Sequence, residues 1–220
     1  METQIRMNIL AREPFAGGIS FGDVGPYERL VGRVEFAVDP VAPAYRNIVD
    51  LEQAPRNTSG FVEYSSEFYL LKPIDLAKGN HRLVYDVNNR GNKRILQFFN
   101  DAVHSNEPST QEHAGNGFLM RGGYTIVWSG WQGDILPGDG RLSIEVPLAT
   151  DSHREITGSV RMEFTADEPG ISSIPLSAND YTDSYETASL DSDSATFTLR
   201  KYERHARQEI PPDRWQFATV

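Results

Sequence analysis

Hydrophobic and polar residues alternate along much of this chain with the two-residue period of β-strands. In "GRVEFAV" (32–38) the valine and phenylalanine side chains fall on one face. A long aromatic-rich run, "GFVEYSSEFYLLKP" (60–73), ends at a proline. A further short strand, "NIVDL" (47–51), is expected after a proline-rich turn. The pattern therefore predicts antiparallel β-structure in the first third of the chain.

Two later runs are continuously apolar instead of alternating. "HRLVYDV" (81–87) and "YTIVWSGW" (124–131) are typical of strands buried on both faces of a parallel sheet. Between them, "KRILQFFNDAV" (93–103) and "AGNGFLMRGG" (114–123) predict helices, the second ending at a glycine pair. Strand, helix and strand in this order predict a βαβ crossover.

The remaining part of the chain predicts three two-sided strands and an acidic loop. Residues 141–149, 158–166 and 195–202 alternate as expected for an antiparallel sheet or an edge extension. Acidic residues accumulate with serine and threonine at about 167–193, where lysine and arginine are absent. Because the oxygen ligands there are irregularly spaced, a solvated loop is favoured over a calcium loop.

Composition narrows the classes of partner. A length of 220 residues is enough to bury a hydrophobic core, in one domain or in two small ones. A net charge of −10 argues against nucleic acid and against anionic membrane surfaces. The absence of cysteine excludes disulfides and a cysteine nucleophile. No apolar signal segment is visible, and no run approaches the roughly 20 apolar residues of a membrane span, so a cytoplasmic location is the default expectation.

Few side chains predict catalysis. The G-x-S-x-G pattern of a strained serine turn is absent. Ser129 in "VWSGWQGD" follows a strand but lacks the glycine two residues before it. His104 and His113 lie near two glutamates, yet no histidine pair has helical zinc spacing, so ordinary loop histidines are favoured. No metal and no cofactor is expected.

Trp128, Trp131 and Asp134 are candidates for a ligand surface. Tryptophan beside carboxylates can line a sugar subsite, and Asp134 and Asp139 are paired acids of that kind. The same residues are explained by a turn in which aspartate and glycine set the backbone. A β-rich module that binds a glycan or polymer without catalysis is therefore the alternative function.

The segment "VNNRGNK" (87–93) follows an apolar strand directly and precedes a predicted helix. Asn88 and Asn89 can cap that helix, Gly91 permits a tight backbone, and Arg90 can clamp a charge. One interpretation is a well-capped strand-to-helix turn. The other is an oxyanion hole, in which main-chain N–H groups face the oxygen of an acyl intermediate. The residues alone leave both open.

Several stretches together resemble a known family. They are "GGISFGDVGPYERLVGRVEFAVDP", "NIVDLEQAPRNTSGFVEYSSEFYLLKP", "RLVYDVNNRGNK", "GNGFLMRGGYTIVWSGWQGDILPGDGRL" and "IPPDRWQFA". In this order they resemble the amino-terminal portion of large bacterial alpha/beta hydrolase domain-containing proteins, which are esterases by family. The resemblance implies an α/β, β-rich fold: an antiparallel β region at 1–78, then the opening βαβ unit of a hydrolase-like sheet within 79–220.

The same resemblance implies a role for the polar loop. "RLVYDVNNRGNK" falls where such folds keep the loop that supplies part of the oxyanion hole. The family's nucleophilic serine, acid and histidine lie later in the chain than this sequence reaches. We therefore expect a contributing segment that is inactive alone, with a small-molecule ester or the missing C-terminal catalytic region as its partner. A non-functional gene remnant is a further possibility.

Overall fold

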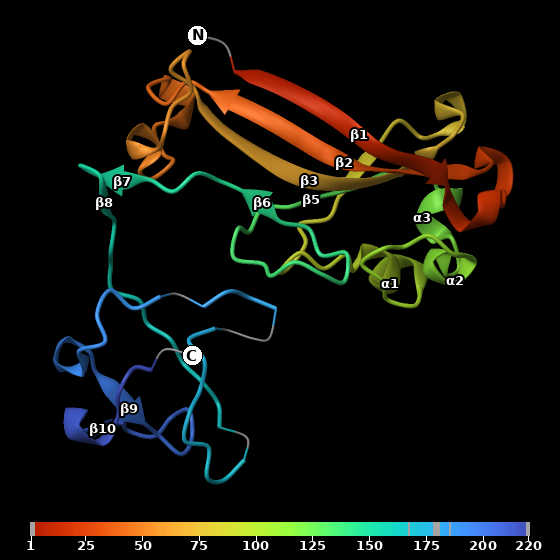
Figure 1. Ribbon diagram of the computed structural model, residues 1–220. Helices are drawn as coiled ribbons and strands as arrows, with labels where there is room; N and C mark the ends of the chain where they lie inside the picture. The colour runs from red at the N-terminus through yellow and green to blue at the C-terminus, as the bar shows by residue number, and fades with distance from the viewer. Residues whose placement is uncertain (1–2, 167, 178–180, 185, 219–220) are drawn as a thin grey trace. The chain divides into compact units, whose positions relative to one another are not determined.

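The computed structural model describes residues 3–166, 168–177, 181–184 and 186–218 (Figure 1). The chain divides into two compact units. The first comprises Met1–Ile156 and Asn179–Asp183, and the second Thr157–Ala178 and Ser184–Val220. The predicted boundary at residue 78 is wrong, because strands on either side of it pair within the first unit.

The first unit is built on one mixed sheet. Its strand order is β1-β2-β3-β5-β4, and β6 pairs with Ser65 and Ser66 near the start of β3. Pairing is antiparallel from β1 to β5, whereas β5 and β4 run parallel. The strands are β1 (Gln4–Pro14), β2 (Tyr27–Val38), β3 (Val62–Pro73), β4 (Leu83–Tyr85), β5 (Thr125–Ser129) and β6 (Ile144–Glu145). The chain is β-rich, as predicted.

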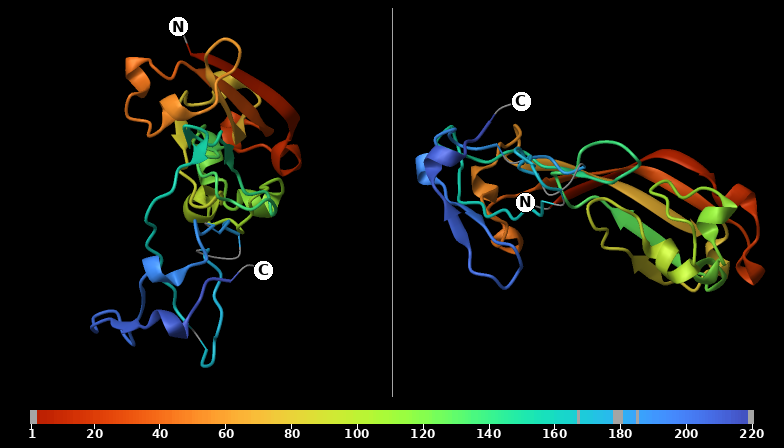
Figure 2. Two further views of the ribbon diagram at one scale, coloured as in Figure 1. Left: turned by 60° about the vertical axis from the view of Figure 1, so that its left-hand side comes forward. Right: turned by 90° about the horizontal axis from the view of Figure 1, so that it is seen from below.

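Three short helices connect the parallel strands β4 and β5. They are α1 (Ile95–Asn100), α2 (Gln111–Ala114) and α3 (Phe118–Arg121). Together they lie against two 3₁₀ turns near the start of the chain, η1 (Phe15–Gly18) and η2 (Gly22–Val24) (Figures 1 and 2). The predicted strand–helix–strand crossover is confirmed.

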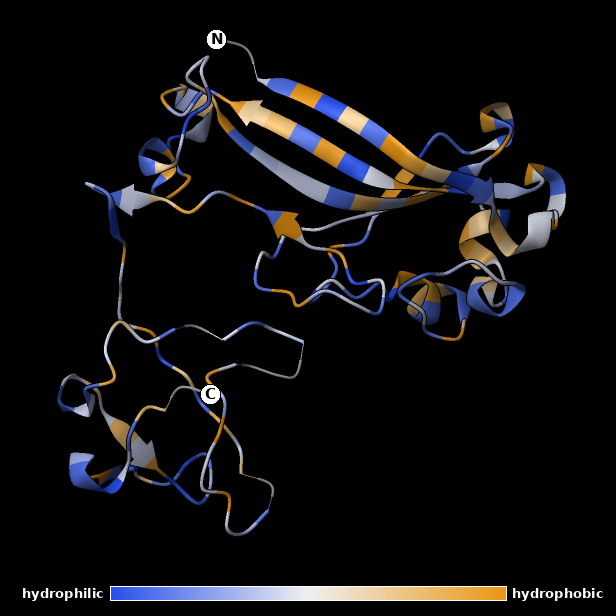
Figure 3. Cartoon of the chain, viewed as in Figure 1, coloured by the Kyte–Doolittle hydropathy of each residue, from blue (hydrophilic) through white to orange (hydrophobic). Residues whose placement is uncertain are grey.

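Other predictions of strands have mixed outcomes. The predicted strands at 32–38 and 60–73 lie in β2 and β3, which confirms them. The strand expected at 47–51 is wrong: this segment is a turn that leads into the 3₁₀ helix η4 (Leu51–Gln53). Only residues 144–145 of the run 141–149 are strand, and 158–166 holds none. Figure 3 shows the alternating hydropathy on β1, a strand that was not predicted.

The core of the first unit packs one face of the sheet against the crossover helices. The hydroxyl of Tyr27 donates to the carbonyls of Met120 and Tyr124, so this large aromatic is buried with its polar atom satisfied. Trp128 packs edge-on against Tyr69 of the neighbouring strand. Other members of the cluster are Phe15, Phe21, Leu71, Ile95, Leu96, Leu119 and Ile126.

Short elements complete the structure. The first unit also holds the 3₁₀ helices η3 (Pro43–Tyr45) and η5 (Leu76–Lys78) and the hairpin of β7 (Thr150–Asp151) and β8 (Arg154–Glu155). The second unit contains the hairpin of β9 (Phe197–Leu199) and β10 (Gln208–Ile210), with η6 (Ser192–Ser194) and η7 (Pro212–Arg214). β9 corresponds to the predicted strand at 195–202. The described part of the acidic segment 167–193 is irregular apart from β-bridge residue Thr182 and the start of η6.

Candidate functional site

Polar side chains gather where the parallel strands β4 and β5 end. The hydroxyls of Tyr85 and Ser129 lie 2.7 Å apart. Asn88 Nδ2 donates to the carbonyl of Ser129 at 2.7 Å, and the indole Nε1 of Trp131 donates to the carbonyl of Asn88 at 2.5 Å. We call these residues, with Arg90 and Gln132, the strand-end site. The carboxyl ends of parallel strands are where open α/β sheets bind ligands.

Asp86 fixes the loop of this site to the core. Its Oδ2 atom accepts hydrogen bonds from the indole Nε1 of Trp128 at 2.6 Å and from the amide of Ile95 at 3.1 Å. The carboxylate therefore joins the buried tryptophan to the first turn of α1. A carboxylate at a helix start is also favoured by the helix dipole.

The prediction that Trp128 forms part of a ligand surface is wrong. Trp128 is 0% exposed and lies in the core, because its strand position points inward and its N–H is satisfied by Asp86. Trp131, which follows the strand, is 49% exposed and belongs to the strand-end site. Asp134 is half-buried, and its main-chain carbonyl accepts from the amide of Asp183. The predicted trio is therefore not brought together on one surface.

The backbone of the loop is tightly constrained at two positions. Arg90 and Gly91 have φ values of +53° and +74°. A Cβ atom on Gly91 would lie 2.6 Å from the carbonyl oxygen of Leu142, so only glycine fits here without displacement of backbone. The amide of Arg90 donates to Gln132 Oε1 at 2.6 Å. The guanidinium Nη1 of Arg90 donates to Thr182 Oγ1 at 2.9 Å. The loop is thereby held in one conformation.

Some polar groups of the loop remain unengaged. The amides of Arg90, Asn92, Lys93 and Ile95 all donate within the fold. Across the described ranges, the main-chain N–H groups of Asn88 and Gly91 meet no acceptor, and the buried Oδ1 of Asn88 also has no partner. Buried polar groups are almost always paired, so unpaired ones indicate a position for a ligand or water.

Lys93 lies buried beneath the loop, and the sequence analysis missed it. Its Nζ donates to the carbonyls of Asn106 and Gly140, both at 2.6 Å, and lies 5.0 Å from the ring centre of Tyr69. Burial lowers the pKa of Lys93 to about 8. The two carbonyls come from distant loops, so no local pattern in the sequence indicates this contact.

Neither the serine nor the histidines form a recognisable catalytic group. The hydroxyl of Ser129 bonds to that of Tyr85, and no histidine of the described residues bonds to it. His113 Nδ1 accepts from the amides of Ser109 and Thr110, so this histidine stabilises the start of α2. No group of three potential metal ligands comes together in the described ranges.

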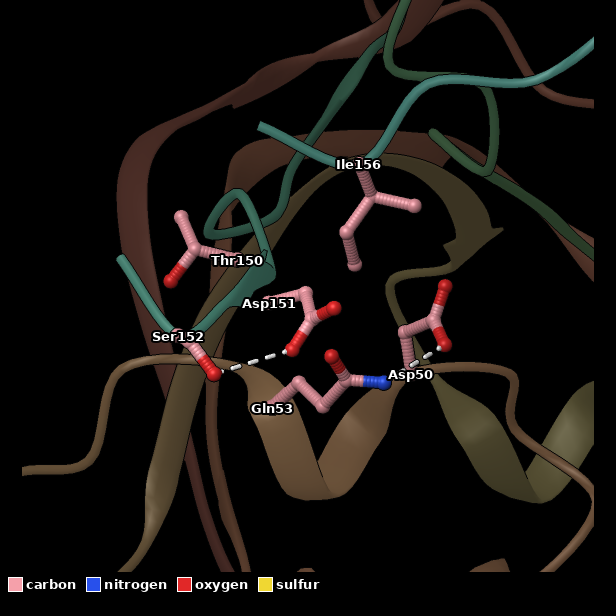
Figure 4. Close-up of a pocket in the computed structure, with 6 residues that line it drawn as sticks. All are labelled: Asp50, Gln53, Thr150, Asp151, Ser152 and Ile156. Carbon is pink, nitrogen blue, oxygen red and sulfur yellow. Dashed lines mark hydrogen bonds between the residues drawn. The ribbon is translucent and has the colours of Figure 1, made fainter. Parts of the chain in front are cut away.

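A separate surface pocket of about 450 Å³ lies between η4 and the β7–β8 hairpin (Figure 4). Gln53 Nε2 donates to Asp50 Oδ1 at 3.1 Å, and Ser152 Oγ donates to Asp151 Oδ1 at 3.2 Å. Its polar side chains therefore bond to one another, and none of its lining atoms is buried without a partner. Thr150 and Ile156 complete the lining. The strand-end site has the stronger signs of a binding function.

Comparison with protein-family models, with curated proteins and with solved structures gave no match. Among the described residues, no helix combines the length and the apolar character that crossing a bilayer requires. The functional argument therefore depends on the strand-end site itself.

Proposed function

We propose that this chain is the amino-terminal part of an alpha/beta hydrolase for carboxylic esters, in which the loop after β4 supplies main-chain donors to an acyl oxyanion. The supporting observation is the loop at Asn88–Gly91, which follows a parallel strand, precedes a helix and holds two unengaged N–H groups. In alpha/beta hydrolases one oxyanion donor comes from a strand-to-helix loop of this kind.

The loop meets the main requirement of such a site, which is preorganisation. Asp86 holds one end of the loop to Trp128 and to α1, while Gln132 holds the amide of Arg90. Donors that are fixed before reaction cost no reorganisation when negative charge develops on the substrate oxygen. A single such donor contributes about 3 kcal/mol to transition-state stabilisation.

The nucleophile is expected on further polypeptide that adds to the sheet at β4. This strand lies at the edge of the sheet, and its Leu83 and Tyr85 are exposed together with Val87. The prediction that 81–87 is buried on both faces is therefore wrong for the structure described here. Parallel strands are ordinarily covered on both faces and flanked by further strands. An exposed apolar edge beside the strand-end site supports the view that the site is completed by another segment.

An ester assay tests the proposal. The purified chain is incubated with p-nitrophenyl butyrate, and release of p-nitrophenol is followed against buffer and against Ser129→Ala. The expected result is no turnover above buffer for either protein, because Ser129 has no base. Sustained turnover that disappears in Ser129→Ala would contradict the proposal and make Ser129 the nucleophile.

A glycan-binding module is the second candidate. It is favoured by the exposed ring of Trp131, whose orientation is fixed by the carbonyl of Asn88, and by the unpaired Oδ1 of Asn88 nearby. A sugar ring can stack on the exposed face of the indole. Quenching of tryptophan fluorescence by cellohexaose, lost in Trp131→Phe and retained in Trp215→Phe, would favour this function.

A further inference from the structure

β1 presents an unpaired strand edge at the side of the sheet opposite β4. It has 11 residues, and among the residues that the structure describes it pairs only with β2. Its alternate side chains Ile5, Met7 and Ile9 are 66%, 55% and 49% exposed. Figure 3 shows this alternation along the strand. An exposed, apolar edge of this length is a template for pairing with another strand.

The amino-terminal half of β1 lacks the features that usually protect an edge. A register irregularity lies between Ile9 and Ala11, and the strand ends at Pro14. Residues 4–9 contain neither a bulge nor a proline, and Arg6 carries their only charge. Bulges, prolines and several charges are the common means of preventing edge-to-edge association.

The apolar stripe continues from β1 onto its neighbours. Ile5 pairs with Phe36 and Met7 with Val34. Phe36 stacks on Tyr64 of β3, with ring centres 4.6 Å apart and an interplanar angle of 10°. One face of this part of the sheet is thus apolar across three strands, so a strand added beside β1 would extend a continuous apolar surface.

We infer that β1 pairs antiparallel with β1 of a second copy of this chain, about a two-fold axis at Met7. In this register Met7 faces Met7, Ile5 faces Ile9 and Arg6 faces Asn8, so the three residues of the apolar stripe oppose one another and no like charges meet. Gln4 faces Leu10, which lies at the register irregularity. Opposed residues of antiparallel strands lie on the same face of the sheet, which preserves the apolar stripe. A C2 interface of this kind is self-complementary.

Neighbouring registers are less favourable. An axis at Arg6 would set two arginine side chains against each other, which is destabilising. An axis at Asn8 would place Arg6 opposite Leu10, within the register irregularity of β1. The register at Met7 is therefore favoured, because it opposes the apolar stripe to itself and avoids the contact between two arginines. The inference uses β1 and its neighbours β2 and β3, and it is independent of the proposed function.

The first experiment measures oligomeric state by sedimentation equilibrium over a range of concentrations. The chain is expected to dimerise. Met7→Lys would place two ammonium groups face to face and raise the dimer dissociation constant about tenfold or more. Val49→Lys is the matched control, because Val49 is 83% exposed and lies in a turn, and it should dimerise as the wild type does. Circular dichroism verifies that both variants are folded.

Disulfide trapping tests the register, since the chain has no cysteine of its own. Opposed Cβ atoms about 5 Å apart are close enough to form a disulfide after small adjustment. Met7→Cys should crosslink with itself, and a mixture of Ile5→Cys and Ile9→Cys should give the mixed dimer in preference to either homodimer. A wild-type chain that stays monomeric at every concentration, or a dimer that Met7→Lys leaves intact, would overturn the inference.

Discussion

Asp86 Oδ2 accepts a hydrogen bond from the indole Nε1 of Trp128 at 2.6 Å, and this contact joins the sheet core to the loop of the strand-end site. The same oxygen accepts from the amide of Ile95, so one carboxylate orients both the core tryptophan and the start of α1. The loop between β4 and α1 is therefore supported from below. This support fixes the position of the loop that carries the unengaged N–H groups of Asn88 and Gly91.

Replacement of Asp86 by asparagine is expected to lower the free energy of unfolding by about 1–3 kcal/mol, because hydrogen bonds to a charged acceptor are lost. Asp101→Asn is the control. Asp101 is exposed and has a φ of +53°, a conformation that asparagine tolerates. The Asp101→Asn substitution should therefore change the free energy of unfolding by no more than about 0.5 kcal/mol. Urea denaturation followed by tryptophan fluorescence provides both values. Equal effects of the two substitutions would argue against the role of Asp86.

Gly91→Ala is expected to lower the free energy of unfolding by more than Gly60→Ala does. Both glycines have positive φ, +74° and +85°, so both substitutions impose similar backbone strain of about 1 kcal/mol. Only Gly91 has backbone within 3 Å of the added Cβ, namely Leu142. The difference between the two variants in urea denaturation therefore measures the close approach of the loop to Leu142. No difference would show that the loop can move away at little cost.

Glu28 is expected to make the stability of the first unit depend on pH in the acid range. Its carboxylate bonds to Arg12 at 2.7 and 2.8 Å and to Lys72 at 2.5 Å. The hydrogen bond from Arg12 is the main cause that lowers the pKa of Glu28 from 4.5 to about 2. Because the folded pKa lies below the unfolded one, the stabilisation is present above pH 4.5 and is lost as the pH falls toward 2.

Glu28→Gln tests this dependence. At neutral pH the variant should be less stable by about 2 kcal/mol, and the difference from wild type should shrink as the pH falls below 4.5. Glu13→Gln removes the partner of Arg29 in a more exposed ion pair and should cost about 1 kcal/mol or less. A Glu28→Gln difference that is constant from neutral to acid pH would exclude the linkage.

Lys93 is expected to make the free energy of unfolding depend on pH in the alkaline range as well. Its folded pKa of about 8 lies below the ordinary value of 10.5, so between these values the unfolded chain binds more protons. Stability should therefore rise with pH above 8, by up to about 1.4 kcal/mol per pH unit. Lys93→Met should lack this rise. The comparison is made below about pH 10, where tyrosines begin to ionise. Parallel pH profiles of the two proteins would contradict the prediction.

The periodic pattern of the sequence predicted the strands β2 and β3 and the crossover between β4 and β5. β2 and β3 carry the two-residue alternation of strands, although β3 buries residues on both faces, such as Phe68 and Tyr69. The crossover from β4 to β5 follows from a strand–helix–strand order. The segment 47–51 is apolar yet forms a turn, because Asp50 has a φ of +56°. The edge position of β4 was missed because a continuously apolar run is typical of buried strands.

The site was predictable in position but not in its contacts. The polar residues after β4 indicated the loop, whereas Gln132 and Lys93 reach it through contacts with distant segments. Trp128 and Trp131 are equivalent as sequence signals. The strand directs one into the core, and the other follows the end of the strand, so only the three-dimensional structure distinguishes them.

The most direct test of the proposed function is amide NMR of the ¹⁵N-labelled chain titrated with methyl butylphosphonate, a tetrahedral anion that mimics an acyl intermediate. The account predicts shifts at the amides of Asn88 and Gly91 and at the indole N–H of Trp131, with that of Trp215 unchanged. Neutral methyl butyrate should give much smaller shifts. Spectra in which Asn88 and Gly91 stay unmoved by the phosphonate would contradict the oxyanion role of the loop.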